Sequence, residues 1–247
     1  MIKYIILGVV QGVTEFFPVS SSAHLVMMQK ILGVQSHQLA LDVILHLGTS
    51  LSLLIFFFKD ILAALRNIRF ILLIIVVTLI TGVIGIAGKN FFESLFSSVG
   101  MTAGALMVTG IILIATRGFR HSTRKTAQMQ DAAAMGLAQG VAIIPGISRS
   151  GITISALLFL GMEAEAAFRF SFLAAIPAIW GAVLLEAKDI GAAAELGLNS
   201  LLAGFISSFL TGIIALYWLR IILKQAKWHY FGYYCLAAGL AAILFLR

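Results

Sequence analysis

The chain has 247 residues, of which 61% are hydrophobic and only 11% are charged, and its net charge is +7. About 25% of the residues in a soluble domain are charged, so this composition, with a mean hydropathy of +1.06, excludes a soluble domain and predicts an all-α, polytopic membrane protein. Lys and Arg in cytoplasmic loops explain the positive charge, so we expect no nucleic-acid partner. The single cysteine, Cys235, excludes an intrachain disulfide and a cysteine-based metal cluster.

Residues 1–38 contain two short apolar pieces separated by a polar break, Gln11 to Leu25. Neither piece has the ~20 apolar residues that a spanning helix needs. Non-helical backbone inside a membrane is tolerated only where protein or water covers it. The sequence therefore predicts a re-entrant helical hairpin. A signal peptide is not expected, because no small-residue cleavage site precedes the polar break.

The rest of the chain alternates apolar stretches with charged ends. Three spans are predicted in the first half, over residues 41–58, 70–88 and 99–116. The second half repeats this plan with a second broken hairpin at 132–162 and spans over 168–186, 199–219 and 229–246. The prediction is one membrane domain, residues 1–247, with repeat halves of about 1–125 and 129–247, two re-entrant hairpins and about six full spans.

The two polar breaks are related to each other in sequence. A shift of 128 positions places Gly8, Gln11, Gly12, Val13, Ser20 and Ser22 on Gly136, Gln139, Gly140, Val141, Ser148 and Ser150. Strict alternation of the spans puts the basic loops 59–69, 117–125 and 220–227 on one side, which the positive-inside rule makes cytoplasmic. Three spans per half then invert the second half, as in many transporter folds with a site near the midplane. The first hairpin is expected to enter from outside and the second from the cytoplasm.

Polar clusters inside a membrane are functional-site hypotheses by default. The planar fork of Arg149 suits phosphate oxygens, Gly146 permits close approach of the backbone, and a helix beginning after Ser148 would point amide groups at an anion. Glu15 and His24 are the acid–base candidates, and a serine becomes a nucleophile only beside such a base. These features predict a phosphoryl-transfer site.

The candidate residues fall into two groups. The catalytic candidates are Glu15, Ser21, His24 and Arg149, with Ser21 or His24 attacking directly or activating water. The substrate-binding candidates are Gln11, Ser20, Ser22, Gly146, Ser148 and Ser150. Structural alternatives remain open: the serines can join helices, Glu15 and Arg149 can form a structural ion pair, and His46 with Asp42 can be a satisfied pair or a support for the site.

The two hairpin motifs carry a resemblance to a known family. Glu15–His24, EFFPVSSSAH, and Pro145–Gly151, PGISRSG, resemble the undecaprenyl-diphosphate phosphatase family of the bacitracin-resistance type. Asp42–Thr49 and Arg169–Ala178 are also similar to it, so the match runs through nearly the whole chain. The resemblance implies a multi-pass hydrolase of the bacterial inner membrane that converts undecaprenyl diphosphate to undecaprenyl phosphate and phosphate. It also implies recycling of the lipid carrier for peptidoglycan in cell wall biogenesis, and antibiotic resistance to bacitracin.

Two positions depart from the family pattern, which often has glutamate at Gln11 and glycine at Ala23. The loss of one carboxylate weakens a metal site built on that pair, although Mg²⁺ or Ca²⁺ with Glu15 as a contact remains compatible with a diphosphate substrate. A homodimer is also left open.

Two other activities were weighed. A polyprenyl-phosphate flippase is the alternative function, since the inverted repeat suits transport, but transport does not require the set of Glu15, serines and His24. An intramembrane serine protease using Ser21 and His24 would leave Arg149 without a role.

Overall fold

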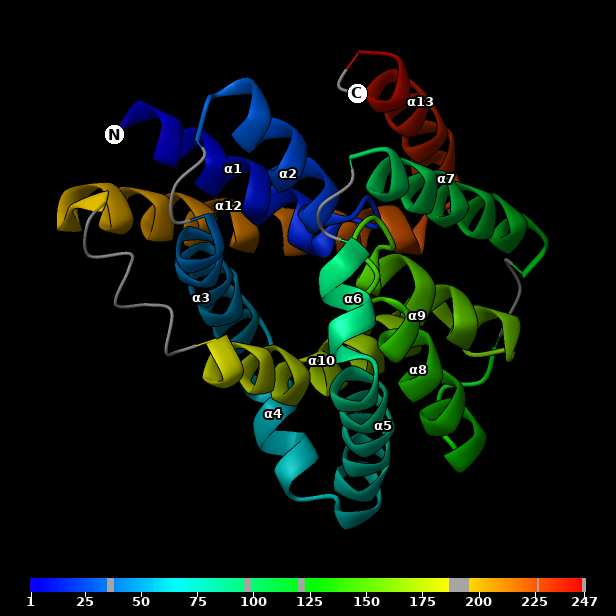
Figure 1. Ribbon diagram of the computed structural model, residues 1–247. Coiled ribbons are helices and arrows are strands. Elements are labelled where there is room, and N and C mark those ends of the chain that lie inside the picture. The colour runs from blue at the N-terminus through cyan, green and yellow to red at the C-terminus, as the bar shows by residue number, and fades with distance from the viewer. Residues whose placement is uncertain (35–37, 96–98, 120–122, 187–195, 226, 246–247) are drawn as a thin grey trace.

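A computed structural model describes residues 1–34, 38–95, 99–119, 123–186, 196–225 and 227–245. Within these ranges the regular elements are helices, so the predicted all-α class is confirmed (Figure 1). They are α1 (Ile2–Phe16), α2 (Ser21–Ile31), α3 (Gln38–Phe56), α4 (Phe58–Leu65), α5 (Ile68–Ala87), α6 (Lys89–Leu95), α7 (Val99–Ala115), the 3₁₀ helix η1 (Thr116–Phe119), α8 (Met129–Val141), α9 (Arg149–Phe159), α10 (Ala164–Glu186), α12 (Leu198–Lys224) and α13 (Tyr230–Phe245).

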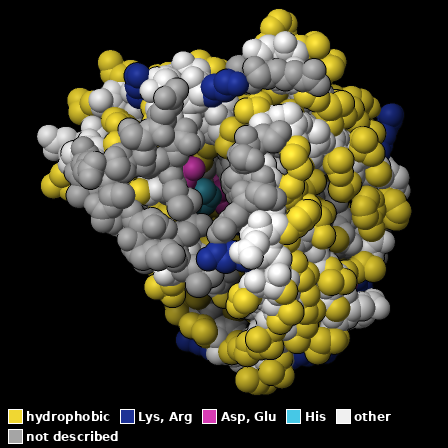
Figure 2. All heavy atoms as spheres, viewed as in Figure 1, with side chains coloured by type: hydrophobic (Ala, Val, Ile, Leu, Met, Phe, Trp, Pro, Cys, Tyr) yellow, Lys and Arg dark blue, Asp and Glu magenta, His cyan; other side chains and the backbone are white. Residues whose placement is uncertain are grey.

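Several of these helices can cross a membrane, which confirms the multi-pass prediction. Four stretches are long and apolar enough, Ile68–Ala87, Val99–Phe119, Ala164–Leu184 and Leu198–Lys224, and α3 with α4 is a fifth if the bent pair is one span. The sixth predicted span is present as α13, whose 16 residues fall short of the ~20 needed to cross the bilayer core. In Figure 2 hydrophobic side chains gather on the right-hand part of the molecule, as a lipid-facing surface requires.

The segment after α3 differs from the expected basic loop at 59–69. The chain bends by 69° between α3 and α4, and α4 is a helix of eight residues, none of them buried. Phe57 stands at the bend and is 1% exposed, because its ring packs against Phe168 at 5.3 Å and Phe172 at 6.0 Å between centroids. Burial of this aromatic ring anchors the bend, and hydropathy alone does not show it.

Both predicted hairpins are present as pairs of short helices. The first consists of α1 and α2 with a break at residues 17–20, and the second of α8 and α9 with a break at 142–148. At 1.5 Å per residue, helices of 11 to 15 residues are ~16–23 Å long and do not cross a bilayer core of ~30 Å. Each second arm begins at a capping serine: Ser20 accepts from the Ala23 N–H at 3.4 Å, and Ser148 accepts from the Gly151 N–H at 3.2 Å.

The two halves use equivalent helix pairs. Helix α1 packs along α12, and α8 packs along α5. At Gly12 an added Cβ would lie 1.9 Å from Oγ1 of Thr211 on α12, and at the equivalent Gly140 it would lie 2.4 Å from Cδ1 of Ile84 on α5. Helices α7 and α13, the last of each half, lie side by side (Figure 1). These contacts support the repeat, while the boundaries of its halves and their sidedness stay predictions.

The basic segments come together at one end of the molecule. Three ion pairs connect elements there: Arg169 with Asp60 at 3.1 Å, Arg220 with Glu165 at 2.6 Å, and Lys125 with Glu163 at 4.0 Å. Residues 120–122 and 226 of these segments lie outside the described residues, as does Arg247. One shared end is what the predicted cytoplasmic placement of all three basic segments requires.

Candidate active site

The tips of the two hairpins meet and exchange hydrogen bonds. The Gly146 N–H donates to Ser22 Oγ at 3.4 Å, and Ser150 Oγ donates to the Phe17 carbonyl at 3.3 Å. Gly146 has a φ of +100°, and an added Cβ there would lie 2.1 Å from the Thr102 carbonyl oxygen. Only glycine fits this turn without strain, so the backbone of the second tip approaches both Ser22 and α7.

Each tip carries a pair of serines with the same spacing. The hydroxyls of Ser20 and Ser22 are 3.1 Å apart, and those of Ser148 and Ser150 are 3.3 Å apart. The Ser148 N–H donates to Thr109 Oγ1 at 3.0 Å, which attaches the start of α9 to α7. The structure therefore brings together the two serine-bearing tips that the 128-residue shift relates in sequence.

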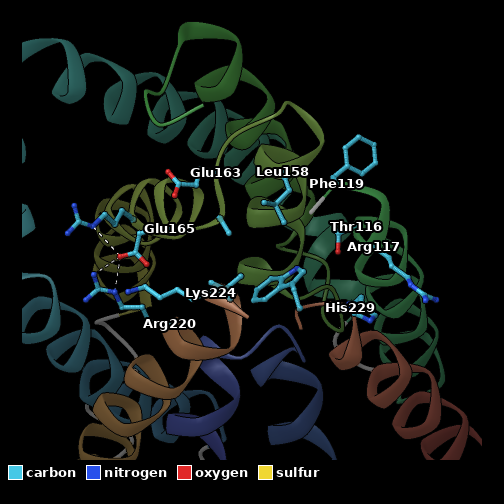
Figure 3. Close-up of a pocket in the computed structure, with 13 residues that line it drawn as sticks. Thr116, Arg117, Phe119, Leu158, Glu163, Glu165, Arg220, Lys224 and His229 are labelled. Atoms are coloured by element: carbon cyan, nitrogen blue, oxygen red, sulfur yellow. Dashed lines mark hydrogen bonds and ion pairs between the residues drawn. The ribbon is translucent and has the colours of Figure 1, made fainter. Parts of the chain in front are cut away.

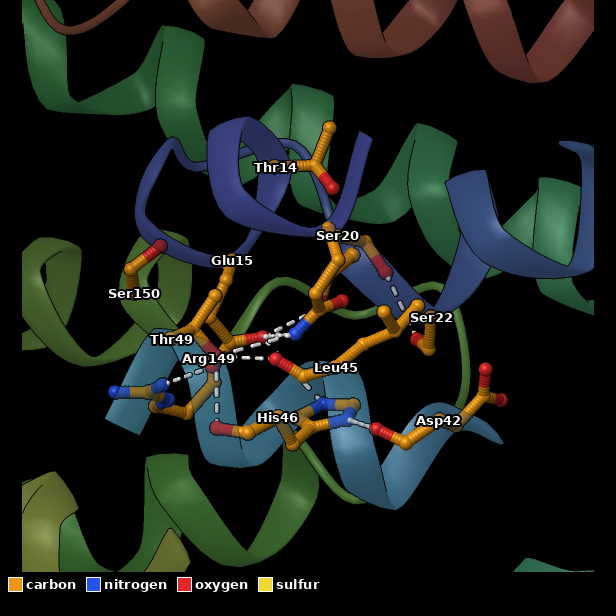
Figure 4. Close-up of polar contacts among 12 residues, drawn as sticks. Thr14, Glu15, Ser20, Ser22, Asp42, Leu45, His46, Thr49, Arg149 and Ser150 are labelled. Atoms are coloured by element: carbon orange, nitrogen blue, oxygen red, sulfur yellow. Dashed lines mark hydrogen bonds and ion pairs between the residues drawn. The ribbon is translucent and has the colours of Figure 1, made fainter. Parts of the chain in front are cut away.

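Glu15 is the centre of the polar cluster (Figure 4). Its carboxylate stands near the end of α1 and its side chain is 8% exposed. Arg149 Nη2 donates to Oε1, while Ser21 Oγ donates to Oε2 at 2.6 Å and Gln11 Nε2 donates to Oε2 at 3.2 Å. These three donors stabilise the ionised carboxylate, and they place Ser21 beside a group that can accept its proton.

Arg149 is the first residue of α9 and only 16% of its side chain is exposed. Its Nη1 atom is buried and has no hydrogen-bond partner within the described part of the chain. Phe172 lies against the guanidinium, with its ring centroid 5.8 Å from Cζ. A buried, unpaired charged donor is costly, so this side of the guanidinium suits an anionic ligand that supplies the missing acceptor.

His46 and Thr49 on α3 complete the cluster. His46 Nε2 lies 3.6 Å from Glu15 Oε2, and its Nδ1 bonds the Asp42 carbonyl at 2.7 Å. Thr49 Oγ1 accepts from Gln11 Nε2 at 3.4 Å. His46 thus bonds the backbone of Asp42, while the Asp42 carboxylate accepts from Gln29 Nε2 at 2.7 Å.

A sequence signal for this face of α3 exists. Asp42, His46 and Thr49 follow one another at spacings of four and three, which places polar groups on one side of a helix. The signal shows that the face is polar but does not show that it contacts Glu15. His46 was weighed in the sequence only as a partner of Asp42 or a support, and Thr49 was missed.

His24 lies apart from the Glu15 cluster. Its Nδ1 bonds the Ser20 carbonyl at 2.8 Å, and its Nε2 bonds the Tyr234 hydroxyl of α13 at 2.7 Å. The His24 and Tyr234 rings are stacked with an interplanar angle of 11°. Among the catalytic candidates, Ser21 and Arg149 therefore each contact Glu15, while His24 bonds the backbone of the turn that precedes Ser21. The role of Tyr234 was missed, because an aromatic residue in an apolar span carries no signal of its own.

Comparison with known proteins identifies the family of the chain. Residues 4–241 match the family described as Bacitracin resistance protein BacA. The chain belongs to that family. It is 42% identical to the undecaprenyl-diphosphatase of Halothermothrix orenii, over 98% of this chain and 96% of the relative. It is 43% identical to that of Carboxydothermus hydrogenoformans, over 97% and 95%, and 38% identical to that of Rhodopirellula baltica, over 99% and 97%. The family expected from the hairpin motifs is confirmed, and the names of these relatives describe hydrolysis, not transport.

Proposed function

We propose that this protein is an integral membrane phosphatase that hydrolyses undecaprenyl diphosphate to undecaprenyl phosphate and phosphate. Membership of the BacA family and relatives named undecaprenyl-diphosphatase support the reaction and its substrate. The observation that carries the proposal is the buried Nη1 of Arg149, a guanidinium donor near the hairpin tips that has no acceptor among the described residues. The product would return to the membrane as the lipid carrier for cell wall synthesis.

In this proposal the diphosphate binds where the second arms of both hairpins begin. Arg149 Nη1 donates to a phosphate oxygen while Nη2 stays on Glu15. Helices α2 and α9 each direct an N-terminus toward the tips, and helix N-termini favour anions. Gly146 lets the backbone come close to the phosphate. The polyprenyl tail lies in the bilayer between helices, because an isoprenoid chain has no polar group that would favour water.

Ser21 is the nucleophile that the geometry favours. Its hydroxyl proton passes to Glu15 Oε2, the Ser21 Oγ–phosphorus bond forms at the terminal phosphate, and the phosphoanhydride bond breaks. Undecaprenyl phosphate leaves with the electron pair of that bond. Water then attacks the phosphoserine: Glu15 returns its proton to Ser21 Oγ, one proton of the water stays on the phosphate and the other goes to solvent. Arg149 stabilises the charge that develops on the phosphoryl oxygens in both steps.

A divalent cation, Mg²⁺ or Ca²⁺, fits this proposal if it binds together with the diphosphate of the substrate. The described residues contain no group of three or more His, Cys, Asp or Glu side chains that could hold a metal ion by themselves. Both ions take oxygen ligands, and Mg²⁺ commonly binds substrate phosphates with one or two carboxylates. The diphosphate would therefore supply most of the ligands and Glu15 the nearest carboxylate. The homodimer left open by the sequence is not needed, since both hairpins come from one chain.

Phosphate release from undecaprenyl diphosphate by the purified protein tests the proposal. We expect Ser21→Ala and Glu15→Gln each to lower turnover ~100-fold or more, because they remove the nucleophile and its base. Ser207→Ala is the matched control: Ser207 Oγ bonds carbonyls of its own helix, α12, at 2.7 and 2.9 Å, and it should keep wild-type turnover. Near-normal turnover in both hairpin variants would remove this site from the reaction.

A further inference from the structure

A polar cavity, lined in part by Leu158, lies outside the Glu15 cluster (Figure 3). It has a volume of about 700 Å³, and its lining includes Leu158 near the end of α9. The 11 residues of α9 make it ~16 Å long, so this cavity is separate from the meeting point of the hairpins. The Trp228 indole N–H, on the cavity wall, donates to Ser155 Oγ at 3.4 Å. Ligand pockets usually measure ~300–1,000 Å³.

The lining carries more positive than negative side chains. Its four Lys and Arg residues are Arg117, Arg169, Arg220 and Lys224, against two carboxylates, Glu163 and Glu165. The carboxylates already have cations: Arg220 and Arg169 lie 2.6 and 3.7 Å from Glu165, and Lys125 lies 4.0 Å from Glu163. Arg117 and Lys224 are exposed and make no ion pair with the described residues. These two cations are available to an anionic ligand.

The ends of the membrane spans give the depth of the cavity. The candidate spans Val99–Phe119 and Leu198–Lys224 end at residues that line it, and the span Ala164–Leu184 begins at one. Spans end where the hydrocarbon core meets the head groups. Leu158, Leu223 and Trp228 form an apolar part of the wall. An amphipathic cavity with surplus cations at this depth is matched to a ligand that has both a phosphate and an acyl chain.

We propose that this cavity binds the phosphate-bearing head group of an anionic membrane lipid, with Arg117 and Lys224 as its phosphate contacts. The acyl chains leave along the apolar wall into the adjacent leaflet. The site does not depend on the phosphatase reaction, since none of the residues that touch Glu15 lines it. It gives the protein a lipid contact at the end where its basic segments gather.

Fluorescence of Trp228 provides a local reading, because this residue is 3% exposed and lines the cavity. The protein has two other tryptophans, so the measurement uses a Trp180→Phe/Trp218→Phe background reconstituted in phosphatidylcholine nanodiscs. We expect a saturable change in emission as phosphatidylglycerol replaces phosphatidylcholine. Arg117→Gln/Lys224→Gln should weaken the apparent affinity ~10-fold or more, as expected for losing two phosphate contacts.

The control removes the same charge from the same predicted face. Lys59→Gln/Arg66→Gln changes two exposed cations that do not line the cavity and should leave the affinity within ~2-fold of wild type, because screening weakens distant charges. Native mass spectrometry supplies a second measurement, in which the Arg117/Lys224 variant should lose bound phosphatidylglycerol. Equal lipid binding by wild type and that variant in both measurements would overturn the proposal. Saturation by inorganic phosphate alone, without an effect of phosphatidylglycerol, would assign the cavity to a soluble anion and also overturn it.

Discussion

The two terminal nitrogen atoms of the Arg149 guanidinium differ in their hydrogen-bond partners. Nη2 is held by Glu15, and Nη1 is buried without an acceptor among the described residues. The sequence predicted that the guanidinium binds phosphate oxygens. It also suggested a purely structural ion pair as the alternative. The two accounts differ in what replacement of Arg149 does to turnover and to folding.

Arg149→Lys should lower turnover of undecaprenyl diphosphate ~100-fold, since Lys keeps the charge but cannot hold Glu15 and a phosphate through one planar fork. Arg149→Ala should lower it further. Thermal unfolding of both variants is the control, because removing one partner of a buried ion pair destabilises a protein by ~3–5 kcal/mol. Wild-type turnover in Arg149→Lys would refute the simultaneous binding of Glu15 and phosphate by this fork, and failure of only Arg149→Ala to fold would favour the structural ion pair.

The proximity of His46 to Glu15 was not predictable from sequence, since it depends on how α3 packs against the first hairpin. We expect His46→Gln to lower kcat ~10-fold with little change in KM, because His46 faces the carboxylate of Glu15 at 3.6 Å, on the oxygen that also accepts from Ser21. His229→Gln, at a buried histidine that lines the other cavity, is the matched control. An unchanged kcat in His46→Gln would show that this side chain does not contribute to turnover.

At the scale of elements, hydropathy and the positions of the polar breaks predicted most of the helices. The polar breaks at Pro18 and Pro145 marked both hairpins, and apolar length marked the spans. Helices α4 and α6 were missed, because seven or eight residues flanked by charges have the composition of a loop. The tip of the second hairpin was predicted as a place where glycine matters, but its contact with α7 required the structure.

Gly146→Ala should disturb that tip. The substitution places a Cβ 2.1 Å from the Thr102 carbonyl oxygen at a φ of +100°, and left-handed backbone for a non-glycine residue costs ~1–3 kcal/mol before the clash is counted. Gly161→Ala is a close control, since its φ is +81° and nothing lies within 4 Å of an added Cβ. We expect both to lower Tm, and only Gly146→Ala to lower turnover strongly. Equal turnover in the two variants would mean that α7 does not set the position of the tip.

At the scale of the whole molecule, the helix contacts fit the two repeat halves that the sequence predicts. The pairing of α1 with α12 matches that of α8 with α5, and the two hairpin tips exchange hydrogen bonds. The sequence predicted this relation from the 128-residue shift. It also predicted that the basic segments share one side, but not the ion pairs of Arg169 with Asp60 and of Arg220 with Glu165, because these pairs join residues far apart in the chain.

The sidedness of the two hairpins follows from that gathering and is the last prediction. Arg124 at the start of the second hairpin donates to the Leu160 carbonyl at its end, at 2.9 Å, so this hairpin opens toward the basic end. The positive-inside rule makes that end cytoplasmic. If the repeat is inverted, the first hairpin opens outward, and Lys3 lies outside while Lys125 lies inside. Both residues are exposed.

Single cysteines at these positions, in a Cys235→Ala background, should react with a membrane-impermeant maleimide from opposite sides of sealed vesicles. Labelling of both from one side would mean that the hairpins enter together, and the site would then need a different route for its lipid substrate.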